Sequence, residues 1–131
     1  MKIPGGSVKR VLVVEDEKAI SELCRRVLVS EGFEVDIAAN GKVAQDMIEK
    51  QPYDLCLIDI RLPLMNGKEL YQWLKEKRPK VANRVIFATG SVMGEDTTTF
   101  LERSGRPYIF KPFNPDELKA VVQETEAKRG E

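Results

Sequence analysis

The chain has 131 residues, 42% hydrophobic and 32% charged, which suits one domain with a buried core. Lys plus Arg and Asp plus Glu number 21 each, so we expect no direct nucleic-acid binding, which normally goes with a basic excess. The absence of histidine and of any CxxC motif argues against His-ligated metals and zinc ribbons. No apolar run reaches the roughly 18 residues of a membrane span, so we expect a cytoplasmic protein without membrane insertion.

Short apolar runs alternate with amphipathic segments along the chain. The runs are nearly continuous and bounded by charge, which is typical of strands buried on both faces of a parallel sheet. They predict strands at Arg10–Val14, Glu34–Ala38, Tyr53–Ile58, Arg84–Ala88 and Tyr108–Phe110. Between them, apolar residues recur at the period of one helix face. They predict helices at Lys18–Ser30, Gly41–Lys50, Gly67–Lys77, Glu95–Arg103 and from Asn114 onward.

Five strands alternating with five helices predict an α/β protein with a doubly wound parallel sheet. Ligands of such folds bind beyond the C-terminal ends of the strands. Five polar residues follow the predicted strands: Glu15 and Asp16 after the first, Asp59 after the third, Thr89 after the fourth and Lys111 after the fifth. We therefore expect three carboxylates, one hydroxyl and one ammonium to meet at one rim of the sheet.

These residue types indicate phosphoryl chemistry with a hard metal ion. Carboxylates without His or Cys favour Mg²⁺, which keeps coordination positions open for phosphate oxygens. A carboxylate can also act as a nucleophile and become an aspartyl phosphate. Glu15, Asp16 and Asp59 together carry three negative charges, which Mg²⁺ and Lys111 would balance. Asp59 follows an apolar run, so its charge needs a partner or a metal.

From Lys9 to about Ala127 the chain resembles a response-regulator receiver domain of a two-component phosphorelay. Four segments carry the resemblance: Val13–Asp16, Leu57–Gly67, Ala88–Gly90 and Lys111–Phe113. It implies a flavodoxin-like sheet with strand order 2-1-3-4-5 and five helices. It also implies a flexible lead-in at 1–8, a receiver domain at 9–127 and a tail at 128–131. Such a domain is no conventional enzyme, although it catalyses its own phosphorylation and slow dephosphorylation.

The resemblance assigns the rim residues to a phosphorylation site. Asp59 matches the phosphoacceptor, which takes its phosphoryl group from a phosphohistidine donor with Mg²⁺ as cofactor. Asp16 and Glu15 match the acidic pair that holds the metal together with Asp59, and the backbone carbonyl of Arg61 matches a further ligand. Lys111 matches the lysine that pairs with the phosphoryl group.

The resemblance also implies a conformational signalling switch. Thr89 matches the hydroxyl that moves toward the phosphoryl group, and Tyr108 matches the aromatic that turns inward with it; a partly buried core aromatic is the other interpretation of Tyr108. The side chains of Arg61 and Ser91 match positions that tune the phosphoryl lifetime. The implied partners are a sensor histidine kinase or a phosphotransfer protein, together with an output protein or domain, and a homodimer stays open.

Two departures from the common pattern concern the switch. The segment 104–107 (SGRP) is one residue shorter than usual, and Pro107 should lie at the first residue of a strand or on a sheet edge. This form is more similar to stand-alone receivers or those of hybrid sensor kinases. Three threonines at 97–99 weaken the preceding helix, either as poor helix formers or as a mobile part of the switch.

Three other functions compete with this interpretation. An aspartyl-phosphate phosphatase needs a second Asp two residues after the nucleophile, where this chain has Arg61. A dinucleotide binder needs a glycine-rich loop after the first strand, where acidic residues stand instead. A phosphorylation-independent adaptor of the same fold, a pseudo-receiver, remains the alternative, although such proteins usually lack the acceptor or the lysine.

Overall fold

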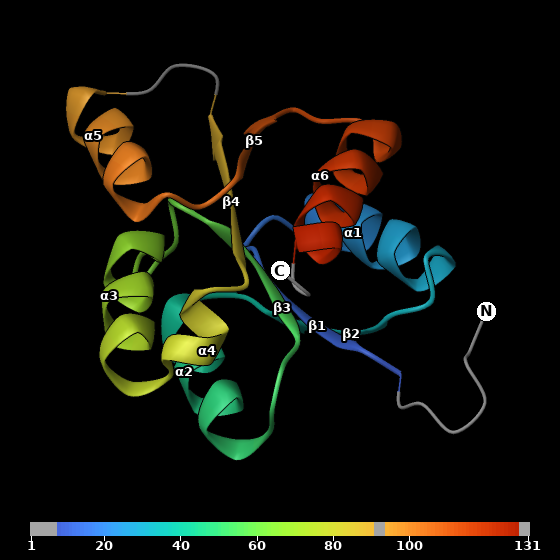
Figure 1. Ribbon diagram of the computed structural model, residues 1–131, viewed down its shortest axis with the longest axis horizontal. Helices are drawn as coiled ribbons and strands as arrows, with labels where there is room; N and C mark the ends of the chain where they lie inside the picture. The colour runs from blue at the N-terminus through green and yellow to red at the C-terminus, as the bar shows by residue number, and fades with distance from the viewer. Residues whose placement is uncertain (1–7, 91–93, 129–131) are drawn as a thin grey trace.

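The computed structural model describes residues 8–90 and 94–128. Figure 1 shows a central sheet with helices packed around it. The strands are β1 (Arg10–Val14), β2 (Glu34–Ala38), β3 (Leu55–Asp59), β4 (Val85–Gly90) and β5 (Tyr108–Lys111). The helices are α1 (Lys18–Ser30), α2 (Gly41–Lys50), α3 (Gly67–Lys77), α4 (Pro79–Ala82), α5 (Glu95–Ser104) and α6 (Pro115–Ala127).

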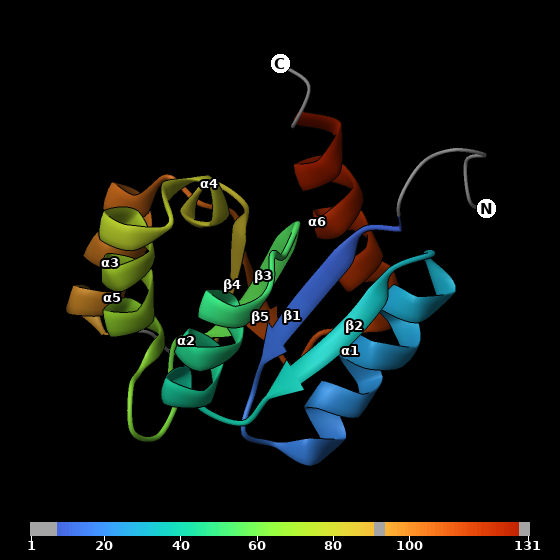
Figure 2. The same ribbon diagram turned by 90° about the horizontal axis from the view of Figure 1, so that it is seen from below.

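The five strands form one parallel sheet with the order β2-β1-β3-β4-β5, which confirms the predicted topology. Helices α1 and α6 cover one face, and α2, α3 and α5 cover the other (Figure 2). Alternate residues of each strand therefore enter two separate cores, with Ile86 on the α1–α6 side and Phe87 on the other. Because all strand pairs are parallel, the C-terminal ends of the five strands lie at one rim of the sheet.

The helix starts have the capping expected from their sequences. Asn66 and Asn114 each accept the N–H of the residue three positions on, and the glutamate at that position accepts the asparagine N–H in return. Such reciprocal bonds satisfy donors that a helix start otherwise leaves unpaired. The ends of α1 and α5 are followed by Gly32 and Gly105, both with positive φ, which glycine adopts without steric cost. The two asparagine caps mark where the rim loops after β3 and β5 end, whereas the two glycines lie at the opposite edge of the sheet.

Several element bounds differ from the prediction: β3 ends at Asp59 instead of Ile58, β4 begins at Val85 instead of Arg84, and α5 ends at Ser104 instead of Arg103. Helix α4 was not predicted, because four residues are too short for a helical period, so the structure has six helices instead of five. Strand β3 begins at Leu55 instead of Tyr53, whose buried hydroxyl donates to Asp36 Oδ2 at 2.7 Å. The strands β4 and β5 extend through Gly90 and Lys111, so Thr89 and Lys111 belong to the strands themselves.

Pro107 lies directly before β5, which is an edge strand, as predicted. The Pro107 carbonyl accepts a hydrogen bond from the Phe87 N–H at 3.0 Å. Proline has no N–H to donate, so it pairs with β4 through its carbonyl alone. The segment 97–99 is helical despite its three threonines. No helix within residues 8–90 and 94–128 combines the length and apolar character needed to cross a membrane.

Candidate functional site

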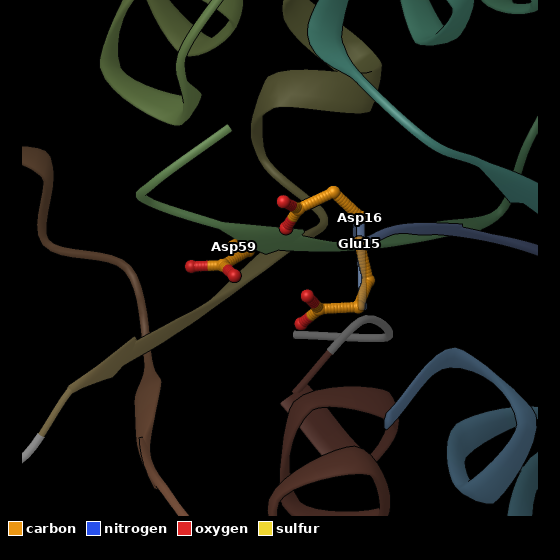
Figure 3. A group of neighbouring side chains, drawn as sticks. All are labelled: Glu15, Asp16 and Asp59. Atoms are coloured by element: carbon orange, nitrogen blue, oxygen red, sulfur yellow. The ribbon is translucent and has the colours of Figure 1, made fainter. Parts of the chain in front are cut away.

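The polar residues predicted at the strand ends converge at one rim of the sheet. Glu15 and Asp16 follow β1, Asp59 ends β3, Thr89 is the second-last residue of β4 and Lys111 ends β5. Figure 3 shows Glu15, Asp16 and Asp59 gathered where β1 and β3 end. One carboxylate oxygen from each of the three lies within 4.8 Å of the others. The topology therefore builds an acidic cluster from segments far apart in the sequence.

Asp59 is buried, with 5% of its surface exposed, and both of its oxygens are hydrogen-bonded. Lys111 Nζ donates to Oδ2 at 2.7 Å, and the backbone N–H of Arg61 donates to Oδ1 at 3.0 Å. A buried carboxylate needs such partners to remain charged. The carboxylate is thus held in one orientation at the end of the strand.

Lys111 is the cation at the centre of this cluster. Its Nζ also lies 3.0 Å from Glu15 Oε1 and 3.4 Å from Glu17 Oε1. Burial acts to lower the pKa of Lys111, but the hydrogen bonds and charges of Asp59 and Glu15 outweigh burial and raise the pKa above its ordinary value. Lys111 is therefore a permanent positive charge next to Asp59. The contact with Glu17 was not predicted, although the acidic run at 15–17 was its signal.

Glu15 is the carboxylate whose proton affinity the site changes most. Burial and, to a smaller extent, the nearby charge of Asp59 raise its pKa to about 7, although hydrogen bonds from the Glu17 N–H and from Lys111 oppose the change. Its side chain is only 4% exposed. The negative charges of the cluster are therefore destabilised by burial and by mutual repulsion. Binding of a proton or of a cation reduces this repulsion.

The cluster fits a hard divalent cation. Its donors are carboxylate oxygens from Glu15, Asp16 and Asp59, two of them buried and Asp16 exposed to solvent. Three carboxylates against the one ammonium of Lys111 leave a formal charge of minus two. Mg²⁺ prefers oxygen ligands and keeps several waters, so a partly open carboxylate cluster suits it.

Thr89 and Tyr108 differ in their surroundings. Thr89 is 5% exposed and lines a pocket of about 540 Å³ together with Arg61. Tyr108 points outward, 43% exposed, with its ring edge-on to Phe110 at 5.6 Å between centroids. The interpretation of Tyr108 as a partly buried core aromatic does not fit this position. Ser91, the other predicted lifetime residue, lies outside the described residues.

Gly67 controls how closely α3 approaches the end of β3. A Cβ on Gly67 would lie 2.5 Å from the backbone oxygen of Asp59 and 2.8 Å from Ile60 Cα. The Gly67 N–H also donates to the Ile60 carbonyl at 2.9 Å. Glycine at this position therefore lets the start of α3 pack directly against the end of β3. The structure explains why a glycine follows Asp59 at this spacing.

Comparisons with known proteins agree with this geometry. The family model of the response regulator receiver domain matches residues 11–123. The transcriptional regulatory protein DltR of Streptococcus agalactiae is 36% identical over 114 residues, which cover 87% of this chain and 50% of that protein. The probable transcriptional regulator ycf29 of Pyropia yezoensis is 33% identical over 113 residues, which cover 86% of this chain and 51% of that protein. The chain thus spans about half the length of these curated relatives.

Solved structures show the same relationship. The CheY-like receiver domain protein from Methanospirillum hungatei is 35% identical, with a TM-score of 0.78 over 93% of this chain and 99% of that one. The receiver domain of a signal transduction histidine kinase from Syntrophus aciditrophicus is 26% identical, with a TM-score of 0.81 over 95% of this chain and 96% of that one. This chain belongs to the response regulator receiver domain family.

Proposed function

We propose that this chain is a phosphorylation-dependent signalling switch in which Asp59 accepts a phosphoryl group from a phosphohistidine. The observation that carries the proposal is the buried contact of 2.7 Å between Asp59 Oδ2 and Lys111 Nζ, inside a cluster of carboxylates. A pseudo-receiver would not need this arrangement of acceptor, cation and metal-type donors. Receiver domains work with a histidine kinase or phosphotransfer partner and with an output domain, so the family supplies the donor class.

The transfer follows from the residues around Asp59. An Asp59 oxygen forms the bond to phosphorus, the bond from phosphorus to the donor's imidazole nitrogen breaks, and its electron pair returns to the imidazole. Lys111 stays charged throughout and neutralises one oxygen of the transferring group. The Arg61 N–H holds the carboxylate in place through its second oxygen. The nucleophile is therefore oriented before the donor arrives.

Mg²⁺ is the cofactor of this proposal. Receiver domains generally bind it in an acidic pocket, and the cluster of Glu15, Asp16 and Asp59 supplies such donors here. Together with the backbone carbonyl of Arg61, these residues would hold the ion. When bound, it supplies positive charge that neutralises the phosphoryl oxygens.

In the proposed switch, Thr89 and Tyr108 change position when Asp59 is phosphorylated, and a partner recognises the changed surface. The Thr89 hydroxyl would bond to the phosphoryl group, and Tyr108, exposed before phosphorylation, would turn inward. A shift from mostly inactive to mostly active needs about 5 kcal/mol of differential stabilisation. The Arg61 and Ser91 side chains would set how long the state lasts. The output is a partner protein or a domain, for which transcriptional regulators such as DltR are a precedent among the relatives.

Intact mass spectrometry after incubation with acetyl phosphate tests the proposal. We expect a gain of one phosphoryl group with Mg²⁺, no gain without it and no gain in Asp59→Asn. Asp46→Asn is the matched control, because Asp46 is an exposed aspartate on α2, and it should be phosphorylated like the unaltered chain. No gain in the unaltered chain with Mg²⁺ would favour the pseudo-receiver.

A further inference from the structure

The pocket beside Asp59 is larger than a phosphoryl group requires. It encloses about 540 Å³ between the loop after β3 and the start of α5. This volume lies in the range of roughly 300–1,000 Å³ typical of pockets for whole small molecules. Its wall includes Arg61, Lys68 and Thr89. The space beyond Thr89 can therefore hold the group from which the phosphoryl is transferred.

Two cations of this wall differ from Lys111 in having no acidic partner. Lys111 lies within 3.4 Å of three carboxylates. In the part of the chain that the structure describes, neither Arg61 nor Lys68 has a carboxylate within 4.0 Å. Lys68 is partly buried, and its Nζ lies 5.8 Å from the centroid of the Phe100 ring. The Lys68 side chain lines this pocket and also a neighbouring hollow that Phe100 lines, and no carboxylate of the described residues neutralises its charge.

Lys68 is also held in a fixed position relative to the phosphoacceptor. It occupies the first turn of α3, whose start is locked by the reciprocal hydrogen bonds between Asn66 and Glu69 at 2.9 and 3.0 Å. The preceding Gly67 packs against the backbone of Asp59. The aromatic contact with Phe100 restricts the end of the Lys68 side chain as well. Lys68 therefore lies on a helix start that packs directly against the end of the strand carrying Asp59.

Thr89 gives an independent sign that the pocket accepts a polar ligand. Its side chain is 5% exposed and lines the pocket. Within residues 8–90 and 94–128 its hydroxyl forms no hydrogen bond, and because no buried polar side-chain atom there lacks a partner, this hydroxyl is open to the pocket. A phosphoryl group at Asp59 would give it a hydrogen-bond partner. The leaving group of the donor would then extend away from the sheet toward Lys68.

We propose that Lys68 is a specificity-determining residue that favours small phosphodonors whose leaving group departs as an anion, namely acyl phosphates. The inference rests on the proposed function, because it requires Asp59 to accept a phosphoryl group. With an acyl phosphate, the bond from Asp59 oxygen to phosphorus forms while the bond from phosphorus to the acyl oxygen breaks. The electron pair stays on that oxygen, which leaves as a carboxylate, and in-line transfer places it on the side of the phosphorus remote from Asp59. Lys68 stabilises the charge that develops there.

A donor with a neutral leaving group would gain little from this cation. With phosphoramidate, the bond from phosphorus to nitrogen breaks and the electron pair stays on the already protonated nitrogen, which leaves as ammonia. No negative charge develops on the leaving atom, so Lys68 has nothing to stabilise. The ratio of the rates with the two donors therefore isolates the contribution of Lys68 from every effect on Asp59, Lys111 or Mg²⁺, which both reactions share.

The test measures phosphorylation rates of the full chain by intact mass with acetyl phosphate and with phosphoramidate, both with Mg²⁺. We expect Lys68→Gln to lower the acetyl phosphate rate about tenfold and to leave the phosphoramidate rate within about twofold. Lys68→Arg should retain the preference. Lys75→Gln is the matched control, because Lys75 lies on the same helix with its Nζ 5.9 Å from the Tyr71 ring but outside this pocket, and both of its rates should be unchanged.

Each other result has a definite meaning. Equal effects of Lys68→Gln on both donors, or no effect on either, would overturn the role of Lys68 while leaving the proposed function intact. A loss of selectivity in Lys75→Gln as large as in Lys68→Gln would overturn it too, because the effect would then be one of general surface charge. Failure of both donors with the unaltered chain would overturn the role of Lys68 and would favour the pseudo-receiver over the proposed function.

Discussion

Lys111 Nζ lies 2.7 Å from Asp59 Oδ2, although the two residues are 52 positions apart and their strands are separated by β4. The side chains are 15% and 6% exposed, so this is a largely buried ion pair. Lys111 also contacts Glu15 at 3.0 Å, and it therefore neutralises carboxylates from both β3 and the end of β1. The stability of the rim and its chemistry depend on the same cation.

Replacing Lys111 is expected to destabilise the fold. In Lys111→Met, Asp59 and Glu15 lose their counter-charge, and removing one partner of a buried pair costs about 3 kcal/mol or more in the free energy of unfolding. Mg²⁺ should restore part of the loss, because a cation in the cluster replaces the missing charge. Urea unfolding with and without Mg²⁺ measures both effects. Unchanged stability without Mg²⁺ would show that the pair contributes little.

The raised pKa of Glu15 predicts a dependence of Mg²⁺ affinity on pH. Burial raises this pKa to about 7, so below about pH 7 a proton competes with the metal. We expect the affinity to rise between about pH 6 and about pH 8, and we expect Glu15→Gln to bind more weakly without this dependence. Calorimetric titration at several pH values measures it. An affinity that stays constant over this range in the unaltered chain would contradict the assignment.

The same group predicts how stability changes with pH in the absence of metal. The folded protein binds the Glu15 proton more tightly than the unfolded chain, whose carboxyl titrates near 4.5. The contribution of Glu15 to the free energy of unfolding is therefore present at low pH and is lost as the pH rises from about 4.5 to about 7. Urea unfolding across this range measures the free energy of unfolding of the unaltered chain and of Glu15→Gln. The value for the unaltered chain minus the value for Glu15→Gln should decrease with rising pH. A difference that increases would contradict the sign.

Gly67→Ala is expected to disturb both stability and chemistry. The new Cβ would lie 2.5 Å from the Asp59 backbone oxygen, so α3 or the end of β3 must move. Such overpacking costs about 1–3 kcal/mol, and a displaced Asp59 should be phosphorylated more slowly. Thermal unfolding and the acetyl phosphate rate measure the two effects. In Gly94→Ala the Cβ would meet nothing within 4 Å, so a stability loss as large as that of Gly67→Ala would rule out the steric explanation.

Arg61 is expected to protect the acyl phosphate from water. Its side chain is exposed and lines the pocket, so a long guanidinium side chain can cover the phosphoryl group. Arg61→Asn should shorten the lifetime of the phosphorylated form severalfold, as measured by the decay of the phosphorylated mass after removal of the donor. A lifetime equal to or longer than that of the unaltered chain would refute this role.

The positions of Thr89 and Tyr108 predict how the switch is read. Tyr108 is 43% exposed, whereas the other two tyrosines, Tyr53 and Tyr71, are 3% and 5% exposed. We expect phosphorylation to slow chemical nitration of Tyr108, and Thr89→Ala to be phosphorylated without slowing it. Peptide mass spectrometry measures all three tyrosines, and the two buried ones serve as internal controls. Equal nitration of Tyr108 in both states would remove it from the switch.

The strand ends were predictable because parallel strands bring them to one rim. The order of apolar runs and helical periods was enough to place Asp59, Thr89 and Lys111 at that rim, and the structure shows them there. Helix α4 was not predictable, since its four residues are too few to show a period. The pairing of Lys111 with Glu17 depends on side-chain reach across the rim, which spacing does not encode. The outward position of Tyr108 likewise depends on the local packing of an edge strand.

The most direct test of the central claim is to locate the phosphoryl group on the chain. Borohydride reduction converts an aspartyl phosphate to homoserine, which tandem mass spectrometry identifies within a peptide. After incubation with acetyl phosphate and Mg²⁺, we predict homoserine at position 59 and at no other aspartate. Homoserine at another position, or a phosphorylated mass that resists reduction, would contradict the account of Asp59 as the phosphoacceptor.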